Sequence, residues 1–528
     1  MKFVDLAEKY NLNTAGDIIA VKKNNIITSL DEPADDEDEF EFIDTSSLEG
    51  IRIYKNTLKF VLVKAVSDLF PGTRLKIHYS VNNGSFCELA GRNVGKEEVN
   101  RIRKRMKYII NRRLLIEKNV YETWHAAKIL EHINRTDLLE VLSANDSGRI
   151  MLYSLEGVFD YFHGLLAPDT GYVDLFELRH FHNGFLMFYP TRFNPGALPK
   201  WKTQKKLARA FEEIRRWGDA IGVDNISDLN ALAQNGGMND IIRVSEALHE
   251  KKIGYIADEI KRKGKNFVFI SGPSSSGKTT FAKRLEVHLK AVGLKAHLIS
   301  LDDYYKGGNI PLDILGKKDY ESPGAFDIVK FNEDLHSLQF IGRAEIPVYD
   351  FATESRKRHR RLDMDLNGVV IVEGIHGNNP AFSTGVDRQR IHKLYISALT
   401  SVSIDDHNRL STTDARLFRR LVRDYKYRGA SAERTLGMWE DVRKGEDLHI
   451  FPFQEEADEI FNSTLIYEHS VLKKYAEPIL MEVGQGSEYY TLARRLLVIL
   501  SYFKEADDAE IPGNSLLREF IGGSVFDY

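Results

Sequence analysis

Cysteine is nearly absent from this chain, since Cys87 is the only one among 528 residues. A single cysteine cannot form an intramolecular disulfide, and it excludes a structural zinc site built from several cysteines. Such scarcity fits a protein of a reducing compartment. We therefore expect neither disulfide bonds nor a cysteine-rich metal centre to hold the fold together.

Long hydrophobic runs and a strong net charge are lacking as well. The apolar runs 185–189 and 496–503 are far shorter than the ~20 residues of a membrane-spanning helix. The first residues, MKFVDLAEKYNLNTAGD, carry charges throughout and lack the apolar core of a signal peptide. A formal charge of −4 is close to balance and selects neither nucleic acid nor an anionic membrane. The sequence thus predicts a cytoplasmic protein without a membrane partner.

The length of the chain predicts two to four domains. Near the N-terminus, strand-like segments at 17–21 and 40–43 flank an acidic run, 35–39, which we interpret as a solvated loop. Mixed α+β patterns follow, with a helix-rich and basic stretch at 98–144, and then amphipathic helical patterns interrupted at 236–237. The expected division is 1–48 and 49–198 for α+β domains, 199–262 for a helical linker, 263–505 for a catalytic domain and 506–528 for a tail.

The sequence pattern is different in the second half, where short apolar segments typical of strands alternate with helical patterns. The expected strands are 267–270, 297–301, 369–372 and 393–398. Alternation of this kind is typical of a parallel, doubly wound sheet with helices on both faces. We therefore predict an α/β fold for this half, preceded by the α+β domains.

A phosphate-binding loop follows the first of these strands, where Gly272-Pro-Ser-Ser-Ser-Gly277-Lys278-Thr279 matches GxxxxGK[ST] and a helical pattern comes next. Its backbone N–H groups and the helix N-terminus favour phosphate. Lys278 is expected to reach the β- and γ-phosphates and Thr279 to ligate Mg²⁺. No [NT]KxD segment indicates guanine selection, so ATP is the expected nucleotide. The nucleotide-binding residues expected here are Gly272, Ser274, Ser275, Ser276, Gly277, Lys278, Thr279 and Thr280.

Two further strands each deliver a carboxylate. Asp302 follows the strand 297–301, where the crevice of a parallel sheet opens, and it suits a base that takes the proton of an acceptor hydroxyl. The alternative, a turn or helix-capping aspartate, stays open. Glu373 follows the strand 369–372, as a Mg²⁺-binding carboxylate does.

Arginines cluster in the segment 416–428, RLFRRLVRDYKYR. Arg416, Arg420 and Arg423 fall on one helical face, and Asp424 is the only acidic partner within the run. Guanidinium groups of this kind neutralise the charge on a transferred phosphoryl group, often from a closing lid. A solvated cationic helix is the alternative.

With these elements in order, the segment 265–480 resembles the uridine kinase family, within the larger group that includes phosphoribulokinase. The shared segments are GPSSSGKTT, ISLDDYY, IPVYDF followed by SRK, VVIVEGI and RRLVRDYKYRG. The resemblance implies phosphoryl transfer to a ribose 5′-hydroxyl, with Asp302 as the base and Lys278 also in the catalytic set. It implies Mg²⁺ at Thr279 and Glu373, and tyrosines bordering the nucleoside at Tyr305 and Tyr349. The arginines implied to contact phosphates or close the lid are Arg420, Arg423 and Arg428.

Three positions depart from the family pattern. Gly324 stands where an aspartate binds the ribose hydroxyls, and we consider Glu321 or Asp327 as its substitute. Glu354 replaces a histidine that reads the pyrimidine edge, and a carboxylate only accepts hydrogen bonds, so the base preference should differ. Ala430 replaces one lid arginine. Phosphoryl transfer is therefore better supported than uridine as the acceptor.

The N-terminal half carries a different resemblance. Residues 1–45 resemble the TGS module, a ubiquitin-like β-grasp domain, and residues 50–190 more faintly resemble the editing-type second domain of threonyl-tRNA synthetase. The editing domain needs an HxxxH helix, yet the segment 54–65 contains no histidine. His163, His180 and His182 alone are a weak case for a metal. We expect this half to regulate, to oligomerise or to bind a ligand.

Three hypotheses about function follow from these patterns. The first is an ATP- and Mg²⁺-dependent nucleoside 5′-kinase with a uridine- or cytidine-like acceptor. The second keeps phosphoryl transfer but takes a sugar phosphate or another small alcohol as acceptor. The third is an RNA-associated ATP-binding regulator, supported by the basic stretch 101–113. Assembly into a homo-oligomer is left open.

Overall fold

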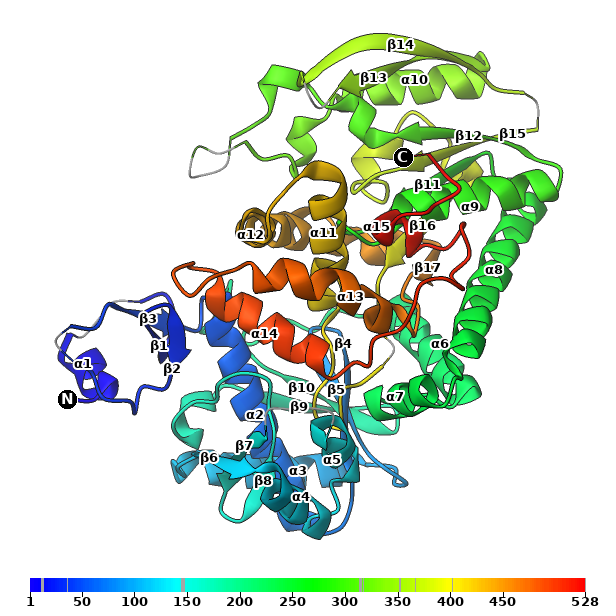
Figure 1. Cartoon of the computed structure of the whole chain (residues 1–528). Helices are drawn as coiled ribbons and strands as arrows, with labels where there is room; N and C mark the ends of the chain where they lie inside the picture. Colours follow the sequence, from blue (N-terminus) through cyan, green and yellow to red (C-terminus); the bar gives the residue numbers. More distant parts are fainter. Residues whose placement is uncertain are drawn as a thin grey trace.

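The computed structural model describes residues 1–10, 14–35, 37–143, 148–312, 316, 318–350, 353–365, 367–400 and 402–527. Figure 1 shows a parallel sheet at one end of the molecule, antiparallel sheets at the other, and a small N-terminal module that projects to the side. The long helix α8, Met238–Arg262, runs along one edge between the two ends. The chain therefore folds as α+β units followed by an α/β unit, as its patterns predict.

The projecting module is a three-stranded antiparallel sheet with one helix. Its elements are α1 Phe3–Tyr10, β1 Ile18–Lys23, β2 Ile26–Thr28 and β3 Phe40–Asp44, in the strand order β2-β1-β3. Phe3, Val21 and Leu30 form its small buried core. Both expected strands of this module are confirmed.

The next unit packs two helices against a four-stranded antiparallel sheet of order β4-β5-β10-β9. Its elements are α2 Leu48–Leu69, β4 Leu75–Val81, β5 Gly84–Leu89, α3 Lys96–Asn111, β9 Glu177–Phe181 and β10 Gly184–Phe188. A second sheet and two short helices lie beside it, formed by β6 Glu117–Glu122, α4 Thr123–His132, α5 Thr136–Ser143, β7 Arg149–Leu155 and β8 Val158–Asp160. The strand β6 lies within a stretch that the sequence predicts as helix-rich. Its largely polar sequence, EKNVYE, suits a strand with one exposed face.

Three helices lead from these sheets to the second half: α6 Lys205–Ile221, α7 Ile226–Gln234 and α8. Gly222 ends α6 with a left-handed backbone conformation. Gly236 also has a positive φ and lies between α7 and α8, which confirms the predicted break there. Ile253, Ile256 and Ile260 of α8 are buried against the parallel sheet and helix α9. These helices thus belong to the core of the second half as well as connecting to it.

The second half is built on a five-stranded parallel sheet of order β12-β15-β11-β16-β17. Its strands are β11 Phe267–Ser271, β12 Lys295–Ser300, β15 Gly368–Glu373, β16 Ile391–Ser397 and β17 Glu459–Asn462. Val268 and Ile270 of β11 pack toward α8 and α9, whereas Phe267 and Phe269 pack toward the opposite face. Because both faces are covered, the strands are continuously apolar.

Helices and a hairpin surround this sheet. They are α9 Lys278–Ala291, α10 Ile328–Phe340, the hairpin β13 Arg343–Asp350 with β14 Ser355–Asp363, α11 Thr412–Arg428, α12 Ala432–His449, α13 Glu468–Met481, α14 Tyr490–Ser501 and α15 Arg518–Ile521. In Figure 1 the hairpin and α10 lie at the far side of the sheet from α11 and α12.

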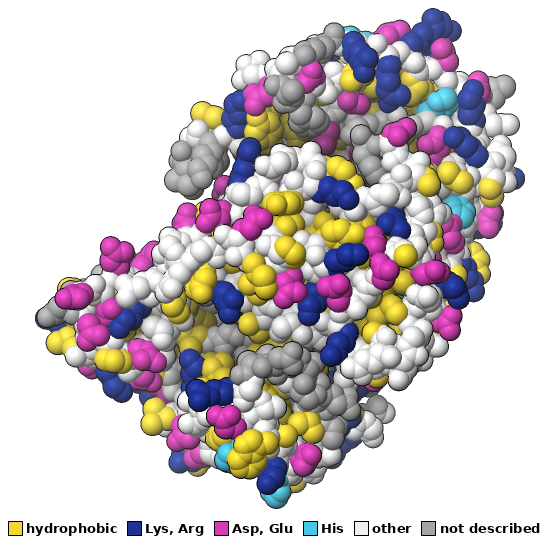
Figure 2. Space-filling view, viewed as in Figure 1, with side chains coloured by type: hydrophobic (Ala, Val, Ile, Leu, Met, Phe, Trp, Pro, Cys, Tyr) yellow, Lys and Arg dark blue, Asp and Glu magenta, His cyan; other side chains and the backbone are white. Residues whose placement is uncertain are grey.

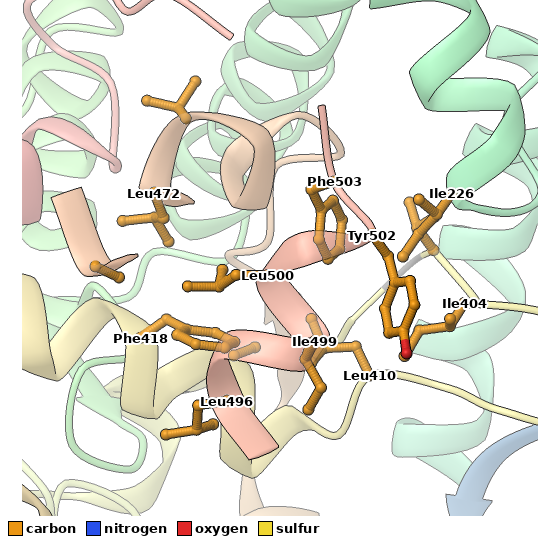
Figure 3. Packing of buried hydrophobic residues seen from close by; sticks show 14 of the residues in the cluster. Ile226, Ile404, Leu410, Phe418, Leu472, Leu496, Ile499, Leu500, Tyr502 and Phe503 are labelled. Atoms are coloured by element: carbon orange, nitrogen blue, oxygen red, sulfur yellow. The ribbon is translucent and has the colours of Figure 1, made fainter. Parts of the chain in front are cut away.

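The largest hydrophobic cluster joins the two halves of the chain. It includes Ile226 of α7, Ile404 and Leu410 from the segment before α11, Phe418 of α11 and Leu500 of α14. Figure 3 shows these side chains converging around α14. The two halves therefore pack against each other through this shared hydrophobic cluster.

The surface carries charges of both signs, in keeping with the small net charge. Figure 2 shows acidic side chains gathered on the projecting N-terminal module, with Lys, Arg, Asp and Glu interspersed elsewhere on this face. No helix within the described part of the chain combines the length and the apolar character needed to cross a bilayer.

Candidate active site

The phosphate loop lies between β11 and α9, at the carboxyl edge of the sheet. Gly277 adopts φ 83° as the N-cap of α9, and Ser275 has φ 59°. A Cβ atom on Gly272 would lie 2.0 Å from the carbonyl oxygen of Ile396, so only glycine fits there. The hydroxyls of Ser275 and Ser276 are buried without a hydrogen-bond partner. Unsatisfied buried donors beside a helix N-terminus are what a phosphate group would satisfy.

Arginines of helix α11 donate hydrogen bonds to this loop. Arg416 donates to the carbonyl oxygen of Ser274 at 3.0 Å, and Arg420 donates to the Ser274 hydroxyl at 2.9 Å. Arg416 is also paired with Glu446 of α12, whose Oε1 accepts the Ser274 N–H at 3.1 Å. Arg419 donates to the carbonyl oxygen of Ser275 at 3.4 Å. We call this set the loop brace: Arg416, Arg419, Arg420 and Glu446.

The brace corrects one expectation. The sequence places Arg416 on a cationic helical face with Arg420 and Arg423, for which a closing lid and a solvated helix are the two interpretations. In the structure Arg416 has no exposed surface and its charge is matched by Glu446. A buried guanidinium must be paired, and the partner comes from another helix. Arg416 therefore supports the loop and is not part of a mobile lid.

The remaining arginines of α11 gather around Asp424. Arg423 lies 2.7 Å from this carboxylate, Arg420 3.2 Å and Arg428 3.6 Å. The Arg428 side chain is 60% exposed at the end of the helix. Arg420 thus contacts the phosphate loop, whereas Arg423 and Arg428 lie further along the same helix. Ala430 follows the αL cap at Gly429 and offers no charge.

The two strand-end carboxylates meet beside Lys278. Strands β12 and β15 pair so that Ser300 is opposite Glu373, and the Ser300 hydroxyl donates to Glu373 Oε1 at 3.1 Å. Burial and the Asp302 charge raise the pKa of Glu373 to about 7, and Lys278 opposes this shift. Burial also raises the pKa of Asp302, again opposed by Lys278. The two carboxylates and the loop lysine therefore share one electrostatic site.

Glu321 belongs to the same electrostatic site at the carboxyl edge of the sheet, and we call this region the crevice because parallel sheets bind ligands at that edge. Burial and the neighbouring Glu446 raise the pKa of Glu321 to about 7, and Arg420 and Lys278 oppose the shift. Its Oε2 is buried without a hydrogen-bond partner. Gly445 permits this position, since a Cβ there would lie 2.3 Å from the Cβ of Glu321. A buried acceptor without a donor is a place where a ligand hydroxyl could bind.

Of the two substitutes considered for the missing aspartate at Gly324, only Glu321 faces the crevice. Asp327 caps α10 by accepting the Lys330 N–H at 3.1 Å, and it pairs with Arg356 at 3.0 Å. Both of its oxygens are thus engaged in holding α10 and the hairpin. Gly324 itself lies in an exposed turn at the N-terminal side of α10.

Aromatic side chains border the crevice. Tyr305 stacks on Phe326 with ring centroids 4.3 Å apart and lies 5.6 Å from the ring of Tyr349. The Tyr305 hydroxyl donates to the carbonyl oxygen of Tyr320 at 3.1 Å. Glu354 lies at the rim with φ 47°, paired with Lys318 and accepting the Tyr320 hydroxyl at 2.9 Å. Its charge is therefore partly neutralised by Lys318.

The donor set fits Mg²⁺. Thr279 is in the first turn of α9, and Glu373 is a buried carboxylate whose pKa is raised first by burial and then by the charge of Asp302. Mg²⁺ in kinases is held by one or two protein oxygens together with substrate phosphates and water. Within the described ranges no three His, Cys, Asp or Glu side chains are grouped for a metal ion.

Three residues of the site escaped the sequence reasoning: Glu446, Glu519 and Ser300. Glu446 carries no motif, because it lies inside an ordinary helical pattern far along the chain from Ser274. Glu519 comes from the segment 506–528, expected to be a tail, and accepts the Thr280 hydroxyl at 2.6 Å. Ser300 alone offered a signal, since it directly precedes the LDDY segment in the strand end already singled out.

In comparisons with known proteins, the second half of the chain matches a kinase family. The family model described as "Phosphoribulokinase / Uridine kinase family" matches residues 267–467. A uridine kinase of Staphylococcus aureus is 31% identical over 199 residues, which is 37% of this chain and 86% of that protein. The solved structure of a possible uridine kinase from Bacillus stearothermophilus has 16% identity and a TM-score of 0.29, covering 40% of this chain and 98% of that one. The chain belongs to the phosphoribulokinase/uridine kinase family and is a P-loop kinase of a small substrate.

The N-terminal region has a different relative. Threonine–tRNA ligase of Rubrobacter xylanophilus is 26% identical over 177 residues, which is 33% of this chain. The chain spans 27% of the length of that ligase. The similarity confirms the synthetase-like character of the extension.

Proposed function

We propose that this chain is an ATP-dependent kinase that phosphorylates the 5′-hydroxyl of a nucleoside of the uridine or cytidine kind. The observation that carries the proposal is the crevice in which Asp302, Glu321 and Lys278 share one electrostatic environment beside the phosphate loop. A base, a sugar-binding acceptor and a phosphate-binding cation are the groups that this reaction requires.

The reaction would proceed by direct transfer. Asp302 accepts the proton of the acceptor hydroxyl, while the oxygen of that hydroxyl forms a bond to the γ-phosphorus of ATP. The bond between that phosphorus and the β–γ bridging oxygen breaks, and ADP leaves. Lys278 and Arg420 neutralise charge on the phosphoryl oxygens, while the brace keeps the loop in one conformation. A Mg²⁺ ion held by Thr279 and Glu373 would offset phosphate charge when bound.

The acceptor preference rests on the walls of the crevice. The rings of Tyr305 and Tyr349 offer an apolar border for a planar base. Glu321 Oε2 offers an unused acceptor for sugar hydroxyls. Glu354, held by Lys318 and Tyr320 at the rim, replaces the pyrimidine-reading histidine. We therefore expect a nucleoside acceptor with a base preference that differs from that of typical uridine kinases.

An ADP-release screen over nucleosides tests this proposal. Uridine, cytidine, adenosine and guanosine are offered with ATP and Mg²⁺, and ribulose 5-phosphate and pantothenate serve as controls. We expect ADP release with at least one pyrimidine nucleoside above the rate without acceptor. Activity with a control compound and silence with every nucleoside would move the acceptor to a sugar phosphate or another small alcohol.

The RNA-associated alternative has less support. In the basic stretch 101–113, Arg105 is paired with Asp68 at 2.7 Å, Arg112 with Glu156 at 3.0 Å, and Arg101 lies over the ring of Phe70. Several of its charges are thus engaged within the protein. We propose no second function from this surface.

A further inference from the structure

The C-terminal segment 514–527 is built into the active-site half. Leu516, Leu517, Phe520 and Ile521 are buried. The Ile521 carbonyl oxygen accepts a hydrogen bond from Lys426 of α11 at 2.5 Å. Asn514 donates to Glu250 of α8 at 2.9 Å, and Arg518 donates to the carbonyl oxygens of Asp508 and Ile511. This segment therefore has a defined place between α8, α9 and α11.

The segment touches the phosphate loop directly. Glu519 Oε2 accepts the Thr280 hydroxyl at 2.6 Å and the Thr280 backbone N–H at 3.3 Å. Leu516 lies against the loop, since a Cβ on Gly277 would come within 2.9 Å of its Cδ2 atom. Further along, the carbonyl oxygen of Asp527 accepts from Lys283 of α9. The C-terminal segment thus covers the first turns of α9.

Thr280 is in the first turn of α9, where backbone N–H groups have no partner within the helix. In a phosphate loop these donors, together with the helix dipole, bind the phosphates of the nucleotide. A carboxylate, like a phosphate, is an anion that accepts hydrogen bonds from such donors. The Glu519 carboxylate already accepts from both the hydroxyl and the backbone N–H of Thr280. Two anions cannot use the same donors at once, and their charges repel each other.

The surroundings add to this competition. The charge of Glu519 contributes to the raised pKa of Glu373. Arg428 also lies within the field of Glu519. Glu519 therefore adds negative charge to the site that binds the phosphates of ATP, and it interacts with Arg428, a cation of the same site.

We propose that the C-terminal segment is an internal competitor of the nucleotide: Glu519 occupies the donors of Thr280, and ATP binds only as this carboxylate leaves them. The inference rests on the ATP site of the proposed function. It assigns the segment 514–527 a regulatory role, because any partner or condition that draws the segment away from α9 would tighten nucleotide binding.

The test uses the full chain and the nonhydrolysable nucleotide AMP-PNP with Mg²⁺, in titration calorimetry. Glu519→Gln keeps the size of the side chain and removes the charge, so we expect AMP-PNP to bind roughly three- to tenfold more tightly than to the parent chain. Glu505→Gln is the matched control, because Glu505 is exposed, precedes the segment 514–527 and should leave the affinity unchanged. Equal or weaker binding by Glu519→Gln would overturn the proposal and make Glu519 a supporting residue.

A second measurement needs no variant. Hydrogen exchange of the parent chain, with and without AMP-PNP, should show faster exchange of amides in 514–527 when the nucleotide is bound. Greater protection of this segment would mean that it closes over the nucleotide, and the proposal would fail. Neither measurement needs an acceptor, so a silent nucleoside screen leaves both readable. Absence of AMP-PNP binding in every variant would remove the nucleotide site and this proposal together.

Discussion

At the scale of single residues, the site is defined by carboxylates that are costly to ionise. Asp302, Glu321 and Glu373 all have raised pKa values, chiefly because of burial. Such groups are rare in a merely structural role, because a folded protein gains nothing from an uncompensated buried charge. A bound cation or a substrate hydroxyl would supply what they lack.

The role of Asp302 leads to the first prediction. Asp302→Asn keeps the shape of the side chain but cannot take a proton, so turnover should fall about 10²- to 10⁴-fold while ATP binding stays nearly intact. Asp303→Asn is the control, because the Asp303 carboxylate accepts the Tyr349 N–H at 3.2 Å and asparagine preserves that acceptor. Steady-state ADP release and AMP-PNP titration separate the two effects. Undiminished turnover in Asp302→Asn would assign the base elsewhere.

Glu321 leads to a prediction about stability. Its pKa in the folded chain is about 7, above the ordinary value of 4.5, so the folded state favours the protonated form. The cost of ionisation is therefore absent below about pH 4.5, grows as the pH rises and is complete above pH 7. Glu321→Gln removes a cost of up to about 3 kcal/mol. It should raise the thermal midpoint of the nucleotide-free protein by a few degrees at pH 8 and change it little at pH 5.

The control for this comparison is Glu333→Gln on α10, where the side chain is exposed. Differential scanning fluorimetry at both pH values records the midpoints. A Glu321→Gln chain that is destabilised at pH 8 would show that the carboxylate is already satisfied within the protein.

At the scale of secondary-structure elements, the central feature is the pair α11 and α12 behind the phosphate loop. Arg416 and Glu446 are both fully buried, and together they hold the N–H and the carbonyl oxygen of Ser274. Arg443 of α12 also pairs with Glu446 at 2.7 Å. The conformation of the loop therefore depends on two helices that follow it far along the chain.

Removing one partner of this pair should be costly. Arg416→Met leaves Glu446 buried with only Arg443 as a counter-charge, and we expect a loss of about 3–5 kcal/mol with weaker AMP-PNP binding. The double variant Arg416→Met with Glu446→Met removes both charges and should recover part of the stability. It should not restore the hydrogen bonds that Arg416 and Glu446 make with the Ser274 backbone. Arg434→Met, at an exposed position of α12, is the control. Thermal midpoints and nucleotide affinity would both stay unchanged in Arg416→Met if the brace had no role.

Local patterns made the strand–loop–helix unit and the strand ends with Asp302 and Glu373 predictable, because each lies within a short stretch of sequence. The brace was not predictable. The spacing of Arg416, Arg420 and Arg423 identifies a helical face, but a face of arginines is normally solvated, and only a carboxylate from another element makes its burial favourable. Glu446 and Glu519 approach the loop through tertiary packing, which no spacing encodes. The edge strand β6 was missed for a different reason, since four of its six residues are polar and its apolar residues, Val120 and Tyr121, are adjacent and do not alternate.

At the scale of the whole molecule, buried charges fasten the N-terminal half to the segment that precedes α11. Arg135 pairs with Asp160 at 2.6 Å and with Asp405 at 3.2 Å, and His407 pairs with Asp160 at 2.6 Å. Burial raises the pKa of Asp405 to about 6, and Arg135 opposes the shift. Asp414 in the first turn of α11 is held by Arg495 and by Arg52 of α2. The N-terminal half therefore contacts the start of α11, the helix whose arginines bind the phosphate loop.

This continuity predicts that the N-terminal half affects catalysis without contacting the crevice. Arg135→Met leaves Asp160 and Asp405 as buried carboxylates with little counter-charge, so the chain should lose about 3–5 kcal/mol of stability. Because Asp405 lies shortly before α11, we also expect weaker AMP-PNP binding and lower turnover at temperatures where the chain is still folded. Arg149→Met is the control, since that arginine is 71% exposed in a surface pair with Glu122. Destabilisation with unchanged nucleotide affinity and turnover would mean that the two halves pack against each other but are not coupled in function.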